Sequence, residues 1–133
     1  MDELDLERPQ AAFSWAGLLE MHREGGRPYL EFLRRGSMSC GLYVLPAGAT
    51  DEQRPHTEDE VYVVTAGGSL FTAGDETREV RAGDVLFVAA GVPHRFHDIS
   101  EELRIVVIFA PPDGSLGDRA TAPGIGDQAP GEG

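Results

Sequence analysis

The sequence lacks lysine and has almost no cysteine, and these absences limit the kind of protein it encodes. All eleven basic residues are arginine, which we interpret as a mark of genome composition, not of function. Cys40 is the single cysteine, so no disulfide can form within the chain. A chain without disulfides is typical of a reducing compartment, and we therefore predict a cytoplasmic protein.

Long hydrophobic runs are also missing. Apolar stretches such as residues 105–110 are far too short to cross a bilayer as a helix. The first residues, Met-Asp-Glu-Leu-Asp, have neither the basic start nor the apolar stretch of a signal peptide. We therefore expect neither a membrane span nor a secretory leader.

Positive charge is scarce relative to negative charge. The sequence has 23 Asp and Glu residues against 11 Arg residues, which gives a formal net charge of −12. An acidic surface repels the phosphates of nucleic acids and the head groups of anionic lipids. We therefore expect no nucleic-acid partner and no membrane partner, and a small molecule as the ligand.

The length of 133 residues suits one domain with its own core. We divide the chain into a flexible N-terminus (1–10), a folded domain (11–112) and a disordered tail (113–133). The tail is rich in Gly, Pro, Asp and Ala and has almost no large apolar side chain. It cannot bury enough surface to offset the entropy that ordering would cost.

A short helix followed by many short strands is predicted for the folded domain. Ser14 can cap a helix from Trp15 to about Arg23, and Gly25-Gly26 ends it. After Pro28 the sequence alternates with period two between Gly- and Pro-containing breaks. The predicted strands cover residues 29–34, 38–45, 60–65, 69–72, 77–80, 85–88, 94–97 and 103–109, with turns that include 66–68 and 99–100. This pattern is typical of an all-β sandwich or barrel.

Two segments carry metal-ligating side chains at the mouth of an apolar strand. His56 lies in the loop that leads into one strand, and Glu60 begins that strand. His94 opens a later strand, directly after Gly91-Val-Pro93. Two imidazoles and a carboxylate are a donor set that suits a divalent metal with open coordination positions.

The first segment resembles the first motif of the cupin superfamily, the small RmlC-like jelly-roll barrels. His56 matches the second His of the family's His-x-His, Glu60 matches its Glu, and Gly67 matches its closing Gly. One position departs from the pattern. Arg54 stands where the family usually has the first His, and a guanidinium has no lone pair to give to a metal.

The second segment resembles the second cupin motif. Gly83, Gly91 and His94 match, while Ala89 replaces the usual Pro and Asp98 replaces the usual Asn. The resemblance covers about residues 29–110. It implies an all-β fold, a small jelly-roll (cupin) β-barrel, to which the sequence adds a short N-terminal helix.

The resemblance also implies a site for one divalent metal ion (Fe, Mn, Zn or Ni), held by His56, Glu60 and His94. Gln53 is a candidate for a weak fourth ligand, although its register is off by one position. Arg54 either faces water or binds an anionic group of the ligand with its planar guanidinium.

The neighbouring residues are interpreted from the parity of the strands. Tyr62 and Phe96 are interpreted as the wall of a ligand pocket or as part of the core. The candidates for ligand binding are Arg54, Gln53, Tyr62 and Phe96. The loop carboxylates 58 and 59 are interpreted as solvated. Asp98 either orients a ligating imidazole or begins a turn.

Three functions are open for such a site. The first is a metal-dependent enzyme, for which the resemblance implies dioxygenase- or isomerase-like chemistry on a small organic substrate. The second is non-catalytic binding or sensing of a small molecule. The third is a barrel that has lost its metal, with Arg54 in place of the cation. Because a fold does not define a reaction, the sequence leaves the choice open.

A homodimer is the expected assembly. The strands 61–65, 85–88 and 105–109 are apolar on both faces, and only one face can fill the barrel. The other face must be covered by the N-terminal segment or by a second subunit. We predict a homodimer formed through the sheet that contains residues 29–45.

Overall fold

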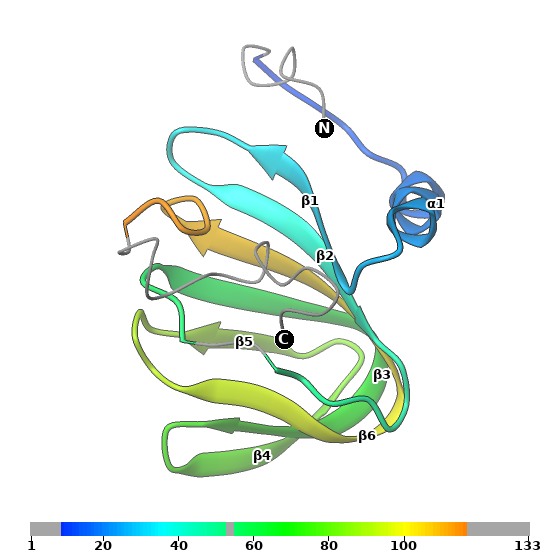
Figure 1. Cartoon of the computed structure of the whole chain (residues 1–133), viewed down its shortest axis with the longest axis vertical. Coiled ribbons are helices and arrows are strands. Elements are labelled where there is room, and N and C mark those ends of the chain that lie inside the picture. The colour runs from blue at the N-terminus through cyan, green and yellow to red at the C-terminus, as the bar shows by residue number, and fades with distance from the viewer. Residues whose placement is uncertain (1–8, 53–54, 117–133) are drawn as a thin grey trace.

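The computed structural model describes residues 9–52 and 55–116. These residues form one short helix and an antiparallel sheet that curls into a barrel (Figure 1). The elements are α1 (Trp15–Gly25), β1 (Tyr29–Arg34), β2 (Ser39–Leu45), β3 (Asp59–Ala73), β4 (Glu76–Arg81), β5 (Val85–Val88) and β6 (His94–Ala110). The strand order is β1-β2-β6-β3-β4, and β5 pairs with β3. The all-β prediction with an N-terminal helix is confirmed.

Helix α1 begins where the sequence predicts and ends two residues later. The hydroxyl of Ser14 accepts a hydrogen bond from the backbone N–H of Gly17 at 3.0 Å. Gly26 adopts the left-handed conformation and donates its N–H to the carbonyl of His22, which ends the helix. Leu18 is the buried residue of α1 and packs on the outer face of β1 and β2, against Phe32 and Leu42.

The two long strands, β3 and β6, correct the sequence prediction, which divided each of them into two. Residues 66–68 are not a turn. They are a run of bulges, because the pairing of β3 with β6 shifts register three times between Val64 and Leu70. Residues 99–100 likewise lie within β6, directly after Asp98, whose φ is 50°.

Each irregularity reverses the parity of its strand. In β3 the buried side chains are at positions 60, 62 and 64 before the bulges and at 69 and 71 after them. In β6 the buried positions change from 94 and 96 to 103, 105, 107 and 109. An extra residue in a period-two strand has this effect, so each strand bends while the same face stays in the core.

Glycine is required at the centre of the β3 bend. Gly67 has φ +92°, and a Cβ atom added there would lie 2.1 Å from the carbonyl oxygen of Glu102 on β6. Gly83 has a similar φ of +99°, but a Cβ atom there would meet nothing within 4 Å. The two glycines therefore share a backbone conformation and differ in the space around them.

We predict that Gly67→Ala destabilises the protein much more than Gly83→Ala does. Gly83→Ala should cost about 1–2 kcal/mol, the usual penalty for an L-residue in the left-handed region. Gly67→Ala should cost roughly 2 kcal/mol more, because the backbone of β6 must also move. Urea denaturation of both variants measures the difference. Equal losses would show that the close approach of β3 and β6 is not required.

Two apolar clusters divide the core. The inner cluster fills the barrel with aromatic and aliphatic side chains, which include Tyr43, Tyr62, Phe71, Phe96, Leu103, Ile105, Val107 and Phe109. The outer cluster joins Leu18 of α1 to the outward faces of β1 and β2. The N-terminal helix therefore covers part of the outer face. Cover by the N-terminal segment was one of the two arrangements expected from the sequence.

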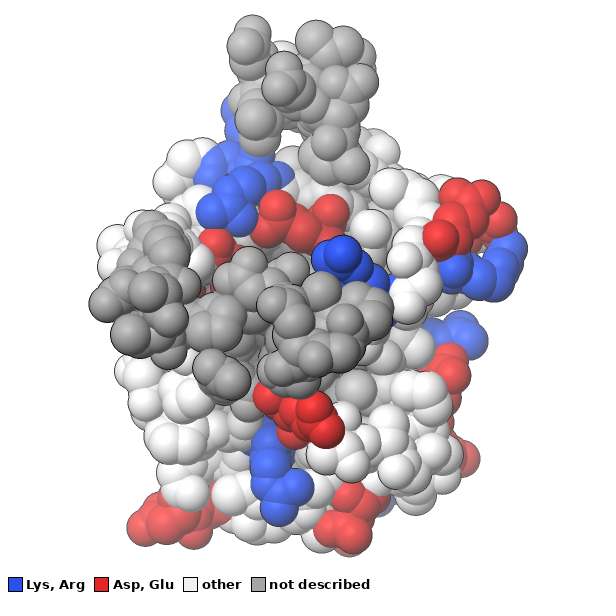
Figure 2. All heavy atoms as spheres, in the orientation of Figure 1, with Lys and Arg blue, Asp and Glu red and all other residues white. Residues whose placement is uncertain are grey.

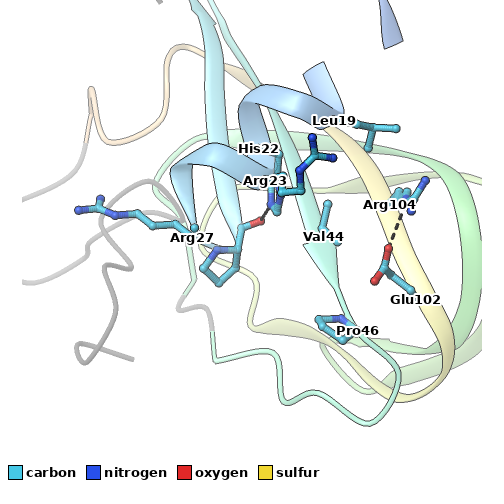
Figure 3. A pocket seen from close by; sticks show the side chains of 10 residues that line it. Leu19, His22, Arg23, Arg27, Val44, Pro46, Glu102 and Arg104 are labelled. Atoms are coloured by element: carbon cyan, nitrogen blue, oxygen red, sulfur yellow. Dashed lines mark hydrogen bonds and ion pairs between the residues drawn. The ribbon is translucent and has the colours of Figure 1, made fainter. Parts of the chain in front are cut away.

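The rest of the outer face is partly open. A groove of about 590 Å³ lies between the C-terminal half of α1 and strands β2 and β6, with Leu19, Val44 and Arg104 among its lining residues (Figure 3). Phe87 on β5 is also exposed. The homodimer stays a prediction.

Acidic and basic side chains lie next to one another in several places on the face shown in Figure 2. Ion pairs between side chains that are close in sequence include Arg104–Glu102 and Arg78–Glu76. No helix among the described residues is long and apolar enough to cross a membrane.

The end of β6 corrects the predicted boundary of the tail. Residues 113–116, assigned to the disordered tail from composition, fold back on the barrel. The N–H of Asp113 donates to the hydroxyl of Ser39 at 2.9 Å, and the N–H of Leu116 donates to Glu58 at 3.0 Å. Composition could not reveal this, since the contacts use backbone groups. Residues 1–8 and 117–133 lie outside the described residues, so the predicted flexibility of the first segment and the predicted disorder of the second stay predictions.

We predict that deleting residues 114–133 destabilises the protein more than deleting residues 117–133. The longer deletion removes a hydrogen bond to the buried carboxylate of Glu58, and a bond to a charged group contributes about 1.5–3 kcal/mol. Urea denaturation of both truncated proteins measures this difference. Indistinguishable midpoints and slopes would mean that residues 114–116 do not stabilise the barrel.

Candidate metal centre

His56, Glu60 and His94 meet at one end of the barrel, and all three are buried. One nitrogen of each imidazole and one carboxylate oxygen lie within 4.8 Å of one another. His56 comes from the loop before β3, Glu60 from the start of β3, and His94 from the start of β6.

The bend of β3 brings these side chains together. His94 pairs with Ala73 at the far end of β3, thirteen positions from Glu60. A straight strand would separate those two ends by roughly 40 Å. Instead, Nε2 of His94 lies 3.0 Å from Oε1 of Glu60. The bulges around Gly67 and the matching bend of β6 near Asp98 therefore bring the cluster together.

The ring of His94 has a defined orientation. Its Nδ1 lies 2.7 Å from the backbone carbonyl oxygen of Val92. A carbonyl oxygen only accepts, so Nδ1 carries the hydrogen and Nε2 is left to face the cluster. Nε2 lies 3.0 Å from Oε1 of Glu60 and 3.0 Å from the hydroxyl of Tyr62.

His56 directs its Nε2 at the same carboxylate oxygen. The distance from its Nε2 to Oε1 of Glu60 is 3.6 Å. Its ring packs edge-on against Phe109, with centroids 4.8 Å apart, and lies 5.4 Å from the ring of His94. On its other side, Nδ1 lies 4.0 Å from Oδ1 of Asp113.

The electrostatic environment keeps His56 neutral. Burial, with a smaller contribution from the nearby His94, lowers the pKa of His56 to about 3, and Glu58 only partly opposes this. A neutral imidazole is the form that binds a metal. His56 therefore keeps an available lone pair at neutral pH.

His94 and Glu60 behave as a coupled pair. Burial raises the pKa of Glu60 and outweighs the hydrogen bonds with His94 and Tyr62. Burial alone would lower the pKa of His94, but the Glu60 carboxyl group beside it raises this pKa overall. The pair thus retains a proton to higher pH than isolated groups would. A metal ion at this point has to displace that proton.

The donor set fits a divalent metal. Two imidazole nitrogens and one carboxylate oxygen suit iron, zinc, manganese or nickel better than calcium or magnesium, which prefer oxygen ligands alone. Three protein ligands leave coordination positions open for water or for a ligand. The burial of all three side chains would strengthen their electrostatic interaction with a cation.

The predicted pocket residues lie beneath this cluster. Tyr62 and Phe96 are fully buried, with ring centroids 5.0 Å apart. Tyr62 contacts His94 through its hydroxyl, whereas Phe96 packs behind it, against Phe71. A role for either residue in ligand binding stays a prediction. Gln53 and Arg54 lie outside the described residues. The hypotheses that depend on them therefore stay predictions.

Two carboxylates differ from their interpretation. Glu58 is 1% exposed, not solvated, and accepts hydrogen bonds from the Thr57 hydroxyl at 2.5 Å and from the N–H of Leu116. The side chain of Asp98 is 73% exposed and contacts Nδ1 of His97 at 2.8 Å. It therefore orients neither imidazole of the cluster.

Sequence reasoning missed two buried carboxylates. Asp51 accepts hydrogen bonds from the hydroxyl of Tyr43 at 2.6 Å and from the N–H of Phe96 at 2.9 Å. It thus links the loop after β2 to the strand that carries His94. Asp113 lies near His56 but belongs to a segment whose composition indicates disorder. The Pro111-Pro112 pair before it was the available signal that the strand ends there.

A comparison with known families agrees with this geometry. A family profile described as the cupin domain matches residues 41–109, which span β2 to β6. The chain belongs to the cupin family. The match includes His56, Glu60 and His94.

Relatives and solved structures support the same assignment. An uncharacterized protein of Streptomyces coelicolor is 55% identical over 85 residues, which cover 64% of this chain and 81% of that protein. The crystal structure of an RmlC-like cupin with a double-stranded β-helix fold, from Methanocaldococcus jannaschii, is similar with a TM-score of 0.58. It is 18% identical and covers 62% of this chain and 78% of its own. The predicted cupin barrel is confirmed.

An enzyme is also among the similar proteins. The acireductone dioxygenase of Geobacillus kaustophilus is 40% identical over 67 residues. The match covers 44% of this chain and only 37% of the dioxygenase. The similarity therefore concerns part of the barrel and leaves most of the dioxygenase without a counterpart in the alignment.

We predict that His56 makes the metal-free cupin less stable in acid. Its pKa is lowered in the folded state, so unfolding takes up a proton below the ordinary pKa near 6.5. The associated stability is complete above that pH and falls as the pH drops toward 3. The total loss is on the order of 4 kcal/mol.

The variant His56→Asn, which cannot titrate, should show a flatter dependence of unfolding free energy on pH between pH 6.5 and pH 4. Urea denaturation in the presence of a chelator measures both proteins. Parallel curves for the two proteins would contradict this account of His56.

Proposed function

We propose that this cupin binds one divalent metal ion at the barrel mouth through His56, Glu60 and His94. One observation carries the proposal: both imidazoles direct Nε2 at the same oxygen of a buried carboxylate. Neither a surface histidine nor an isolated ion pair would place two imidazoles around one oxygen of a buried carboxylate. The neutral state of His56 and the fixed orientation of His94 support it further.

We further propose a metal-dependent enzyme of the dioxygenase or isomerase type that acts on a small organic substrate. The bound ion would supply a Lewis acid with open positions for ligand oxygens. Glu60 and the two histidines would hold it, and the hydroxyl of Tyr62, which lies 3.0 Å from Nε2 of His94, would be a hydrogen-bond donor close to the ion. The partial similarity to an acireductone dioxygenase favours oxygen chemistry on an enediol-like substrate.

Non-catalytic binding or sensing is the second candidate, and one observation favours it. The side chains of His56, Glu60 and His94 are each 1% exposed. Residues 113–116 lie close to this end of the barrel, with Asp113 near His56 and Leu116 bonded to Glu58. A substrate could reach the ion only after some of these groups move, whereas a stably held metal ion needs no such access.

The cellular setting belongs to the same proposal. A single buried cysteine suits a cytoplasmic protein, and the partly open outer face suits a homodimer. A small molecule is the expected ligand, since the acidic surface disfavours nucleic acids and anionic membranes.

We predict that the protein binds one equivalent of zinc, iron, manganese or nickel after dialysis against each metal. The melting temperature should rise with metal concentration, because only the folded state binds tightly. Both effects should be lost in His94→Ala and in Glu60→Gln. His22→Ala serves as the control, since His22 lies on α1 and contacts the carbonyl of Pro28. Elemental analysis and thermal denaturation measure the outcome.

Full metal content in both His94→Ala and Glu60→Gln would contradict the proposal. The same loaded protein separates the two candidate functions. Oxygen uptake with an acireductone would support the enzyme, and tight binding of that compound without turnover would support the binding protein.

A further inference from the structure

Each imidazole of the cluster has an acceptor oxygen near its Nδ1, on the side away from the proposed metal position. Behind His94, the backbone carbonyl of Val92 lies 2.7 Å from Nδ1. Behind His56, the carboxylate of Asp113 lies 4.0 Å from Nδ1. In each case an oxygen that can accept a hydrogen bond faces Nδ1, while Nε2 faces Glu60.

Asp113 is held in place from two sides. Its N–H donates to the hydroxyl of Ser39, a fully buried residue of β2. Its carbonyl oxygen accepts a hydrogen bond from Nη2 of Arg34 on β1 at 3.0 Å. The side chain is 5% exposed, so its carboxylate is removed from bulk water. These contacts place a carboxyl group next to His56, which a loose tail would not do.

We propose that Asp113 is a positioning residue for His56. Its carboxylate accepts the Nδ1 hydrogen, which fixes the tautomer with a lone pair on Nε2 and holds the ring toward Glu60. The present separation exceeds a hydrogen bond by about 1 Å, a distance that small side-chain rotations can close. A carboxylate behind a ligating imidazole also makes that imidazole a stronger donor to a metal.

This role makes the start of the C-terminal segment part of the metal site. The N–H of Leu116 donates a hydrogen bond to the carboxylate of Glu58, which lies between His56 and Glu60 in the sequence. Residues 113–116 thus contact the ligand loop at two points, through His56 and through Glu58. The inference rests on the proposed metal site, but the contact between Asp113 and His56 can be tested without metal.

The chain offers a matched control for Asp113. The carboxylate of Asp98 also faces a histidine Nδ1, that of His97, at 2.8 Å. The Asp98 side chain is 73% exposed, and neither residue belongs to the buried cluster. Asp98→Asn removes one negative charge beside an imidazole, as Asp113→Asn does. Asn also tolerates the positive φ of position 98. Only the Asp113 change should affect the metal.

The first measurement is zinc affinity, determined by competition with a chromophoric chelator. Asp113→Ala should weaken zinc binding by about 10- to 100-fold, the usual effect of removing a group that orients a metal ligand. Asp113→Asn retains a carbonyl oxygen as acceptor and should show a smaller loss. Asp98→Asn should bind zinc like the parent protein. Parent-like affinity in Asp113→Ala would overturn the proposal.

The second measurement is the tautomer of His56 in metal-free protein, read from long-range proton–nitrogen NMR spectra with labelled histidine. The parent should carry its hydrogen on Nδ1, and Asp113→Ala should shift His56 toward the other tautomer. Weaker zinc binding without this change would assign Asp113 a merely structural role and overturn the proposal. If Asp113→Ala does not fold, Asp113→Leu, whose branched side chain is similar in shape but has no acceptor oxygen, provides both readouts.

The two measurements also separate this inference from the proposed function. A parent protein that binds no metal contradicts the metal site, yet a tautomer change in Asp113→Ala still supports the contact with His56. A parent that binds zinc, together with an unchanged tautomer, contradicts only the role of Asp113.

Discussion

The bend in β3 is the constraint on which the rest of the structure depends. Glu60 and the pairing partner of His94 are at opposite ends of this strand, and the bulges around Gly67, with the matching bend of β6 near Asp98, bring His94 to Glu60. The close approach of Gly67 to the carbonyl of Glu102 leaves no room for a side chain. The same bulges reverse the parity of β3, so the inward face stays apolar on both sides of the bend. Fold and site thus share one structural cause.

The burial of the side chains at the barrel mouth also determines which of them hold a proton. Burial lowers the pKa of His56 and raises that of Glu60, so the cluster contains a neutral imidazole beside a carboxyl group that retains protons. Such a group of side chains is costly without a partner ion, because buried polar atoms lose their interactions with water. A divalent cation would offset this cost by replacing the shared proton, which makes the cluster better suited to metal binding than to stabilising the barrel.

Local patterns predicted the elements well and their long-range arrangement poorly. The cap at Ser14, the end of α1 near Gly26 and strands β1 and β5 follow from capping and period-two alternation. The three cluster residues follow from motif spacing. The continuity of β3 does not, because Gly67 predicts a turn as readily as a bulge until the register with β6 is known. The burial of Glu58 and Asp113 was missed for a related reason, since both depend on backbone groups that composition does not report.

Crystallography of the protein reconstituted with zinc, with anomalous diffraction at the zinc edge, tests the central claim most directly. The account predicts one strong anomalous peak, about 2.0–2.2 Å from Nε2 of His56, Nε2 of His94 and a carboxylate oxygen of Glu60. A barrel mouth without an anomalous peak, in crystals whose zinc is bound at another place on the protein, would contradict it.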